Sequence, residues 1–226
     1  MTISSADWAE ASSFVRDLGY RGNVLEDDKF REQAVDYLTL LLQKNQEVNL
    51  TGAKDLETAF WKHLVDSLAL LSLEPLGPLV DWGSGGGLPG IPVALARKHS
   101  GDTSPVHFVD SVGKKISAVV EFCDALDLPN AHGHIGRGEE LIRLGTLKGI
   151  QNVTMRAVAP ADRAIAWMTG SVPQWIFFLG PNQVEDWKKM RSRLLRMGLH
   201  IHREEFFSLP RNLGERCLLR ISKSST

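Results

Sequence analysis

Apolar and polar positions follow a helical period over the first third of the chain. Within 30–49, the apolar residues that recur at this spacing are Phe30, Val35, Leu38, Leu41 and Leu42. The segment 55–73 has the same period, and Asp55 stands where the N-cap of a helix is expected. We therefore predict that 7–72 is helical, with a turn at 49–52 between two long helices.

From Pro78 onward, short β-type runs alternate with helical stretches. The β-type runs are 78–82, 105–110, 131–136, 152–159, 174–179, 198–207 and 214–222. Helices are predicted to begin at about Ile91, Lys114 and Glu139, and to cover 160–168 and 183–197. This alternation predicts a parallel sheet with helices on both faces. The last two runs have no helix between them, so one strand is expected to run antiparallel.

The domain organisation follows from this pattern. We find no internal repeat and no low-complexity linker in the sequence. We therefore expect a single α/β domain over 1–226, with a helical cap over 1–76 and a sheet-containing core over 77–226.

Composition excludes several classes of protein. The chain has 226 residues, of which 43% are hydrophobic and 23% charged, and its 26 basic residues nearly balance its 27 acidic ones. A nucleic-acid partner would therefore have to bind a local basic patch. The first residues lack a signal-peptide pattern, and no apolar run approaches the roughly 20 residues that span a bilayer. Cys123 and Cys217 have no metal-type spacing. We expect a cytoplasmic monomer without a membrane partner.

The sequence DWGSGGGLPG, residues 81–90, follows the first β-type run and precedes a predicted helix. Glycine permits positive φ angles at such a turn and lets a ligand lie directly against the backbone. The following helix directs its free N–H groups and positive dipole end toward the same place. The carboxyl ends of parallel strands are also where open α/β sheets bind ligands. We therefore predict a ligand site at this turn.

The turn alone leaves the cofactor open. GGGLPG fits the dinucleotide pattern G-x-G-x-x-G, which favours NAD(P). Asp110 ends the second β-type run, where it could hold the ribose hydroxyls of either NAD(P) or S-adenosylmethionine. Asp81 stands two residues before the first glycine, and the sheet is expected to finish antiparallel. These two features favour S-adenosylmethionine.

Several segments together resemble one family, the bacterial small-subunit rRNA guanine-N7 methyltransferases (RsmG, or glucose-inhibited division protein B). They are NQEVNLTG, HLVDSL, DWGSGGGLPGIP, FVDSVGKKISAV, GRGEEL, RAVA and GERCLL, in family order. The resemblance implies a Rossmann-like S-adenosylmethionine-dependent methyltransferase fold. That fold is a mostly parallel seven-stranded sheet with one antiparallel strand, here with an N-terminal helical cap. It also implies methyl transfer to N7 of a guanine in the decoding region of 16S rRNA, free or in a small-subunit particle.

The resemblance also implies which residues bind the cofactor. The positions that match the family motifs are Gly83, Leu88, Gly138, Glu139 and Arg156, and Asp110 matches the ribose-binding acid of the wider fold. Each polar residue has a structural alternative. Glu139 would support the first turn of a helix, Arg156 would form an ion pair, and Asp110 would cap a strand end.

The absence of certain motifs agrees with a ring-nitrogen target. Guanine N7 has a free lone pair, so positioning and electrostatics suffice and no general base is required. The place after the fourth β-type run reads MRAVAP and lacks the Asn/Asp-Pro-Pro-aromatic motif of exocyclic-amine methyltransferases. Neither cysteine is placed as a nucleophile for C5 methylation. We assign no catalytic residue.

An RNA substrate requires a cationic surface. The segment 188–203 has six Lys or Arg and no acid, and its predicted RNA-binding residues are Lys188, Lys189, Arg191 and Arg193. Lys114, Lys115 and the segment 211–216 are further basic candidates. The alternative is a solvated helix face that is basic without binding RNA.

Two departures from the family pattern keep other functions open. The lysine that usually follows the fifth strand is replaced by Leu179 or Gly180, and RAVA stands where RAF is usual. The alternatives are an NAD(P)-dependent oxidoreductase that uses GGGLPG, and a non-catalytic ribosome-assembly or nucleotide-binding factor.

Two pairs of residues that contain histidine are the remaining candidates. His132 and His134 share one face of a β-type run, but without companions they favour a surface role, and we predict no metal site. His63 and Asp66 lie one helical turn apart, which favours a hydrogen bond that fixes the helix rather than a catalytic pair.

Overall fold

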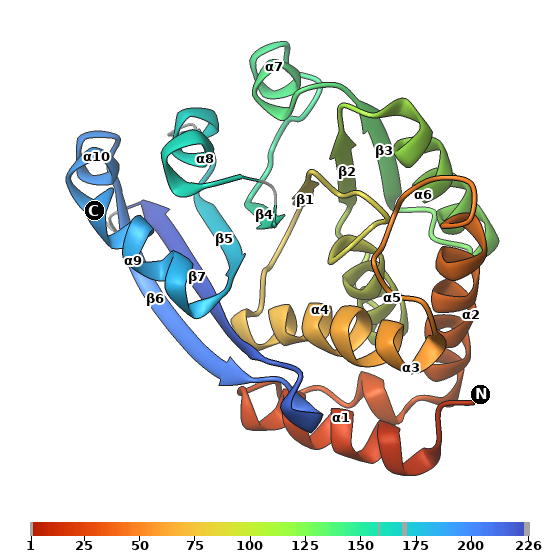
Figure 1. Ribbon diagram of the computed structural model, residues 1–226. Helices are drawn as coiled ribbons and strands as arrows, with labels where there is room; N and C mark the ends of the chain where they lie inside the picture. The colour runs from red at the N-terminus through yellow and green to blue at the C-terminus, as the bar shows by residue number, and fades with distance from the viewer. Residues whose placement is uncertain (1, 158, 169–170, 224–226) are drawn as a thin grey trace.

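The computed structural model describes residues 2–157, 159–168 and 171–223, and it contains a sheet with helices on both faces (Figure 1). The sheet has seven strands. They are β1 (Leu79–Trp82), β2 (Val106–Asp110), β3 (Ala131–Ile135), β4 (Asn152–Arg156), β5 (Gln174–Leu179), β6 (Leu199–Ser208) and β7 (Glu215–Lys223). All seven β-type runs of the sequence are strands, so this prediction is confirmed.

The strand order is β3-β2-β1-β4-β5-β7-β6. β1 to β5 pair in parallel, whereas β7 lies between β5 and β6 and is antiparallel to both. A tight connection can join β6 to β7 only if the two run in opposite directions. The predicted mostly parallel sheet with one antiparallel strand is confirmed, as is the Rossmann-like methyltransferase fold class.

The helices occur largely where the sequence predicts them. They are α1 (Ser5–Asp17), α2 (Asp28–Lys44), α3 (Leu56–Ala59), α4 (Asp66–Leu68), α5 (Gly90–Ser100), α6 (Gly113–Ala125), α7 (Gly138–Arg143), α8 (Ala161–Trp167), α9 (Pro181–Lys189) and α10 (Arg191–Arg196). A π-helical segment, Phe60–Val65, joins α3 to α4, and a 3-10 segment follows over Ala69–Leu73. The Asp55 side chain accepts the Thr58 N–H, which confirms Asp55 as an N-cap.

One helix prediction needs correction. The sequence predicts a single helix over 183–197, but the structure has two, α9 and α10, with Met190 between them. The Met190 N–H donates to the carbonyl of Trp187, three residues back, so the helical ladder tightens and breaks there.

Two hydrophobic clusters cover the two faces of the sheet. One contains the N-terminal helices together with α5 and α6, and includes Tyr37, Leu64, Phe108 and Ile176. The other lies beneath α7, α8 and α9. In Figure 1 the N-terminal helices, red to orange, lie on the same side as α5. Because the first cluster joins the cap to the sheet, the cap is packed into the core that positions the site.

The carboxyl ends of β1 to β4 meet at one edge of this sheet, and the turns that follow them converge there. Among the described residues, no helix is long and apolar enough to cross a membrane.

Candidate functional site

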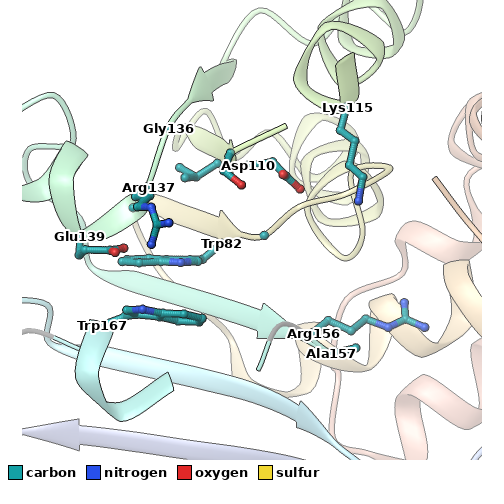
Figure 2. A pocket seen from close by; sticks show the side chains of 13 residues that line it. Trp82, Asp110, Lys115, Gly136, Arg137, Glu139, Arg156, Ala157 and Trp167 are labelled. Carbon is teal, nitrogen blue, oxygen red and sulfur yellow. The ribbon is translucent and has the colours of Figure 1, made fainter. Parts of the chain in front are cut away.

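A cavity of about 380 Å³ opens at the carboxyl ends of β1 to β4 (Figure 2). Its size lies in the range of small-molecule sites in proteins. Five of the six predicted cofactor-binding residues line it: Gly83, Asp110, Gly138, Glu139 and Arg156. The sixth, Leu88, lies outside the lining and packs against the cluster that joins the cap to the sheet.

The glycine turn after β1 bends as the sequence predicts. Gly83, Gly85 and Gly87 all have positive φ angles, of 74°, 56° and 90°. A Cβ on Gly85 would meet nothing closer than 4.0 Å, so this glycine leaves open space beside the cavity. The turn therefore combines a sharp bend with bare backbone.

Asp81 lies beneath the turn rather than in the cavity. Its Oδ2 accepts the N–H of Gly90 at 2.8 Å, and a Cβ on Gly90 would collide with Phe108 and with Asp81 itself. The Asp81 side chain is fully buried, and burial raises its pKa to about 7. The sequence places Asp81 at the end of its strand, but β1 continues to Trp82. Asp81 thus holds helix α5 against the strand.

Asp110 ends β2 and its carboxylate reaches the cavity. Its Oδ2 accepts the N–H of Gly85 at 3.1 Å, and its Oδ1 accepts the N–H of Val112 at 2.9 Å. The carboxylate therefore fixes the glycine turn, and each oxygen keeps a second lone pair for a ligand hydroxyl. Asp110 can therefore cap the end of the strand and still accept a hydrogen bond from a ribose hydroxyl.

Gly138 and Glu139 begin helix α7. A Cβ on Gly138 would come within 2.6 Å of the indole of Trp82, so a residue without a side chain is required there. Glu139 lies in the first turn of α7, where an acid is favoured, and it also lines the cavity. Glu139 forms no ion pair within the part of the chain that the structure describes.

Arg156 joins the end of β4 to the helical cap. Its Nη2 lies 2.8 Å from Oδ2 of Asp66 and donates to the carbonyl of Lys62 at 2.6 Å. Asp66 is 1% exposed and also lies 3.5 Å from Nε of Arg216 on β7. Figure 2 shows Arg156 extending away from the tryptophans of the cavity. Arg156 therefore forms an ion pair, as its structural alternative predicts, and it also lines the cavity.

The predicted hydrogen bond between His63 and Asp66 is wrong. His63 Nδ1–H donates to the carbonyl of Lys62 at 2.9 Å, and its Nε2 is bonded to the hydroxyl of Thr51. Burial, followed by the charge of Arg156, lowers the His63 pKa to about 4. His63 and Asp66 contact the same arginine, Arg156 of β4, instead.

The predicted RNA-binding residues lie on α9 and α10. Lys188 pairs with Glu185 and Glu204, and Lys189 pairs with Asp186. Helix α10, with Arg191 and Arg193, leads into the start of β6, beside the amino-terminal end of β5. The cavity is at the opposite edge of the sheet from the end of α10, and none of the four residues lines it.

Two other cations line the cavity. Lys115 comes from the first turn of α6, and Arg137 precedes α7 (Figure 2). Neither forms an ion pair with any residue that the structure describes. By contrast, Arg211 in the connection from β6 to β7 is bound by Asp7, Glu10 and Glu57 of the cap.

The residues that replace the usual lysine of the family lie at the end of β5 and the start of α9. Leu179 is 6% exposed at the end of β5, and the Gly180 N–H donates to the side chain of Gln183 at the start of α9. Neither residue lines the cavity. Val158, the aromatic position of the family, lies outside the described residues.

Both cysteines are buried, and three histidines of β2 and β3 lie close together. Burial raises the pKa of Cys123 to about 12 and that of Cys217 to about 11. His107 of β2 joins the predicted pair, with Nδ1 3.0 Å from Nε2 of His134. Even so, the residues with a described position include no group of three or more ligands that could hold a metal ion.

The two tryptophans of the cavity, Trp82 and Trp167, are not among the residues predicted from the sequence. Trp82 follows Asp81 on a strand, so its side chain points to the opposite face, which the alternation of a strand could have shown. Trp167 is the last residue of α8, and no sequence signal places it beside the end of β1.

Comparisons with known proteins agree with this architecture. The chain matches the family model described as rRNA small subunit methyltransferase G over residues 31–203. It is 32% identical to the Ribosomal RNA small subunit methyltransferase G of Legionella pneumophila (strain Lens) over 208 residues, 89% of this chain and 91% of the relative. It is 32% identical to the protein of that name from Xylella fastidiosa (strain M23) over 220 residues, 92% and 94% of the two chains.

Among solved structures, the chain is similar in fold to M. capricolum TrmK in complex with S-adenosyl-homocysteine. The TM-score is 0.53 at 13% identity, over 66% of this chain and 63% of that one. At this identity the likeness concerns the fold alone.

Proposed function

The chain belongs to the rRNA small subunit methyltransferase G family, and we propose that it transfers a methyl group from S-adenosylmethionine to N7 of a guanine in the decoding region of 16S rRNA. The observation that carries this proposal is the cavity at the carboxyl ends of β1 to β4. There the open turn at Gly85 lies within hydrogen-bond distance of the Asp110 carboxylate.

The residues of the cavity fit the cofactor. The bare backbone at Gly85 leaves space that a Cβ would fill, and Asp110 offers free lone pairs to a ribose diol. In this proposal Gly83 and Gly138 allow close approach, Glu139 accepts hydrogen bonds from the adenine end, and Arg156 holds the fourth strand in place. Leu88 stays a prediction from the family motif. When bound, S-adenosylmethionine supplies an electrophilic methyl group on a positively charged sulfur.

The protein's contribution to the reaction is positioning. N7 of guanine needs no deprotonation, so a general base is not required. The described residues agree with this requirement. His63 is bonded on both ring nitrogens and has a lowered pKa, and Asp81 is buried beneath the turn. In this proposal the site aligns the base with the methyl group.

The proposed substrate is an exposed base. The major-groove edge of guanine, which carries N7, is inaccessible in the deep and narrow groove of an A-form duplex. We therefore propose that the target guanine is unpaired, in free 16S rRNA or in a small-subunit particle. We also propose that the protein acts in the cytoplasm as a monomer. The predicted contacts of Lys188, Lys189, Arg191 and Arg193 with RNA remain part of this proposal.

The two alternative functions give different results in binding and activity assays. An NAD(P)-dependent oxidoreductase would bind NAD(H) saturably and would not bind S-adenosylmethionine. A non-catalytic assembly factor would bind the cofactor but incorporate no methyl group.

The test of the proposed function is methyl incorporation from tritiated S-adenosylmethionine into 16S rRNA and into purified 30S particles that lack the modification. Digestion and mass spectrometry then identify the modified nucleoside. We expect 7-methylguanosine at a single position of the decoding region. Incorporation at another atom or in another RNA would contradict the proposal.

A further inference from the structure

Two tryptophans form part of the cavity wall. Trp82 comes from the end of β1 and Trp167 from the end of α8, and both line the same cavity. Figure 2 shows their indole planes roughly parallel, one above the other, with Glu139 beside Trp82. Flat aromatic walls of this kind are suited to a planar ligand group.

Trp82 is held in one orientation. The backbone of Gly138 lies against its indole, so closely that a Cβ there would collide with three of its ring atoms. The indole of Trp175 lies 5.7 Å away between ring centroids, at an interplanar angle of 51°. Trp82 is only 5% exposed, so it acts as a fixed wall whose accessible part faces the cavity.

Trp167 is the more accessible of the two. It is partly buried against the cluster beneath α7, α8 and α9, and it forms no ring contact or hydrogen bond with the described residues. Its indole is therefore available to a ligand, and Glu139 and Arg137 of the same lining provide polar groups nearby. A carboxylate without an ion-pair partner can accept hydrogen bonds from an exocyclic amino group.

We propose that a purine ring stacks on the indole of Trp167, against the fixed wall of Trp82, with its exocyclic amino group directed to Glu139. Adenine and guanine share this chemistry, since each has a flat π-surface and an amino group. The purine could come from the adenine of the cofactor or from the guanine of the RNA, and naming these two ligands rests on the proposed function. The stacking of a purine on Trp167 does not rest on it.

The experiment compares two substitutions of Trp167. Trp167→Leu keeps apolar bulk at the end of α8 but removes the flat face, and Trp167→Phe keeps a smaller flat face and serves as the matched control. Stacking of one base on an aromatic side chain changes affinity by about 5- to 150-fold. We expect Trp167→Leu to lose affinity for one purine ligand within this range and Trp167→Phe to retain most of it. Thermal unfolding of both variants measures any loss of folding.

Two measurements distinguish the sources of the purine. If the dissociation constant of S-adenosylhomocysteine rises in Trp167→Leu and KM for 16S rRNA does not, the stacked ring is adenine. If KM rises and the dissociation constant does not, the ring is guanine. If neither changes while the variant stays folded, the proposal is overturned.

A third measurement does not depend on methyl transfer. Free adenosine and guanosine 5′-monophosphate are titrated into the wild type and Trp167→Phe while tryptophan fluorescence is recorded. Stacking on Trp167 predicts quenching in the wild type that is smaller in the variant, in which Trp82 alone is quenched. Quenching without methyl incorporation would leave the stacking intact and contradict the proposed function, whereas equal quenching in both proteins would overturn the stacking.

Discussion

Arg156 and Asp66 form an ion pair, with 2.8 Å between Nη2 and Oδ2, that joins the end of β4 to the helical cap. Asp66 is 1% exposed, and Arg156 also donates to the carbonyl of Lys62. One side of the cavity therefore depends on a contact between segments that are far apart in the sequence. The cap is part of the site through this contact.

Replacing Arg156 tests the ion pair. Arg156→Gln leaves the buried Asp66 with only the longer contact to Arg216, so we expect the free energy of unfolding to fall by about 3 kcal/mol. Urea unfolding measures this loss. In an Asp66→Asn background the same substitution should cost much less, and equal costs in both backgrounds would show that the two residues are not coupled.

Replacing Asp110 tests the ribose contact. Asp110→Ala removes a charged acceptor, and hydrogen bonds to charged groups contribute about 1.5–3 kcal/mol, so affinity for S-adenosylmethionine should fall about 10- to 150-fold. Titration calorimetry measures the dissociation constant. Asp124→Ala, an exposed aspartate on α6, is the control and should bind normally. An unchanged affinity in Asp110→Ala would refute the contact.

Charge reversal tests which surface binds RNA. Lys115 and Arg137 line the cavity without carboxylate partners, whereas Lys188 and Lys189 are already paired with acids and do not line it. We expect the double variant Lys115→Glu with Arg137→Glu to bind RNA more weakly. The slope of log affinity against log salt concentration should become shallower by about 1.4, since each contact with single-stranded RNA contributes about 0.7. Filter binding at several salt concentrations measures the slope.

The same assay tests the predicted RNA contacts of the basic helices. If Lys188, Lys189 and Arg191 bind RNA, their reversal to glutamate should reduce the slope more than reversal of the cavity pair. The affinity of each variant for S-adenosylhomocysteine controls for damage to the cofactor site.

Acid should destabilise the protein through His107. Burial, followed by the charges of His134 and His132, lowers its pKa from 6.5 to about 4 in the folded state. Between pH 6.5 and 4 the unfolded chain therefore binds a proton that the folded chain does not, and stability is lost as the pH falls. His107→Gln should reduce the loss between pH 7 and 5 by about 1–2 kcal/mol. Urea unfolding at both pH values measures this loss. An equal loss of unfolding free energy in wild type and variant would contradict the prediction.

Titration of Asp81 should destabilise the protein as the pH rises, in contrast to His107. Its pKa rises from 3.8 to about 7 on burial, so the folded chain holds an extra proton between those values and stability is lost as the pH rises through them. Asp81→Asn keeps an oxygen that can accept the Gly90 N–H and removes the titration. We expect the variant to gain stability relative to wild type as the pH rises from 5 to 8, measured by urea unfolding. A constant difference across this range would be inconsistent with the raised pKa.

The sequence by itself determined the order of elements and most of the predicted residues that line the cavity. Local signals sufficed there: apolar periodicity fixed the strands and most helices, and the glycines with Asp110 stand at strand ends, which a parallel sheet brings to one edge. Such residues are near one another in the chain or at equivalent ends of neighbouring strands, so spacing alone locates them.

Only the tertiary structure decided which contacts the site makes across distant segments. Arg156 meets Asp66, Trp82 lies against Gly138, and Trp167 reaches the same cavity, because helices packed on either face of the sheet bring these side chains together. The structure likewise leaves the basic residues of α9 and α10 out of the lining of the cavity. Periodicity reports which face of an element is buried, but it carries no information about which distant element that face will contact.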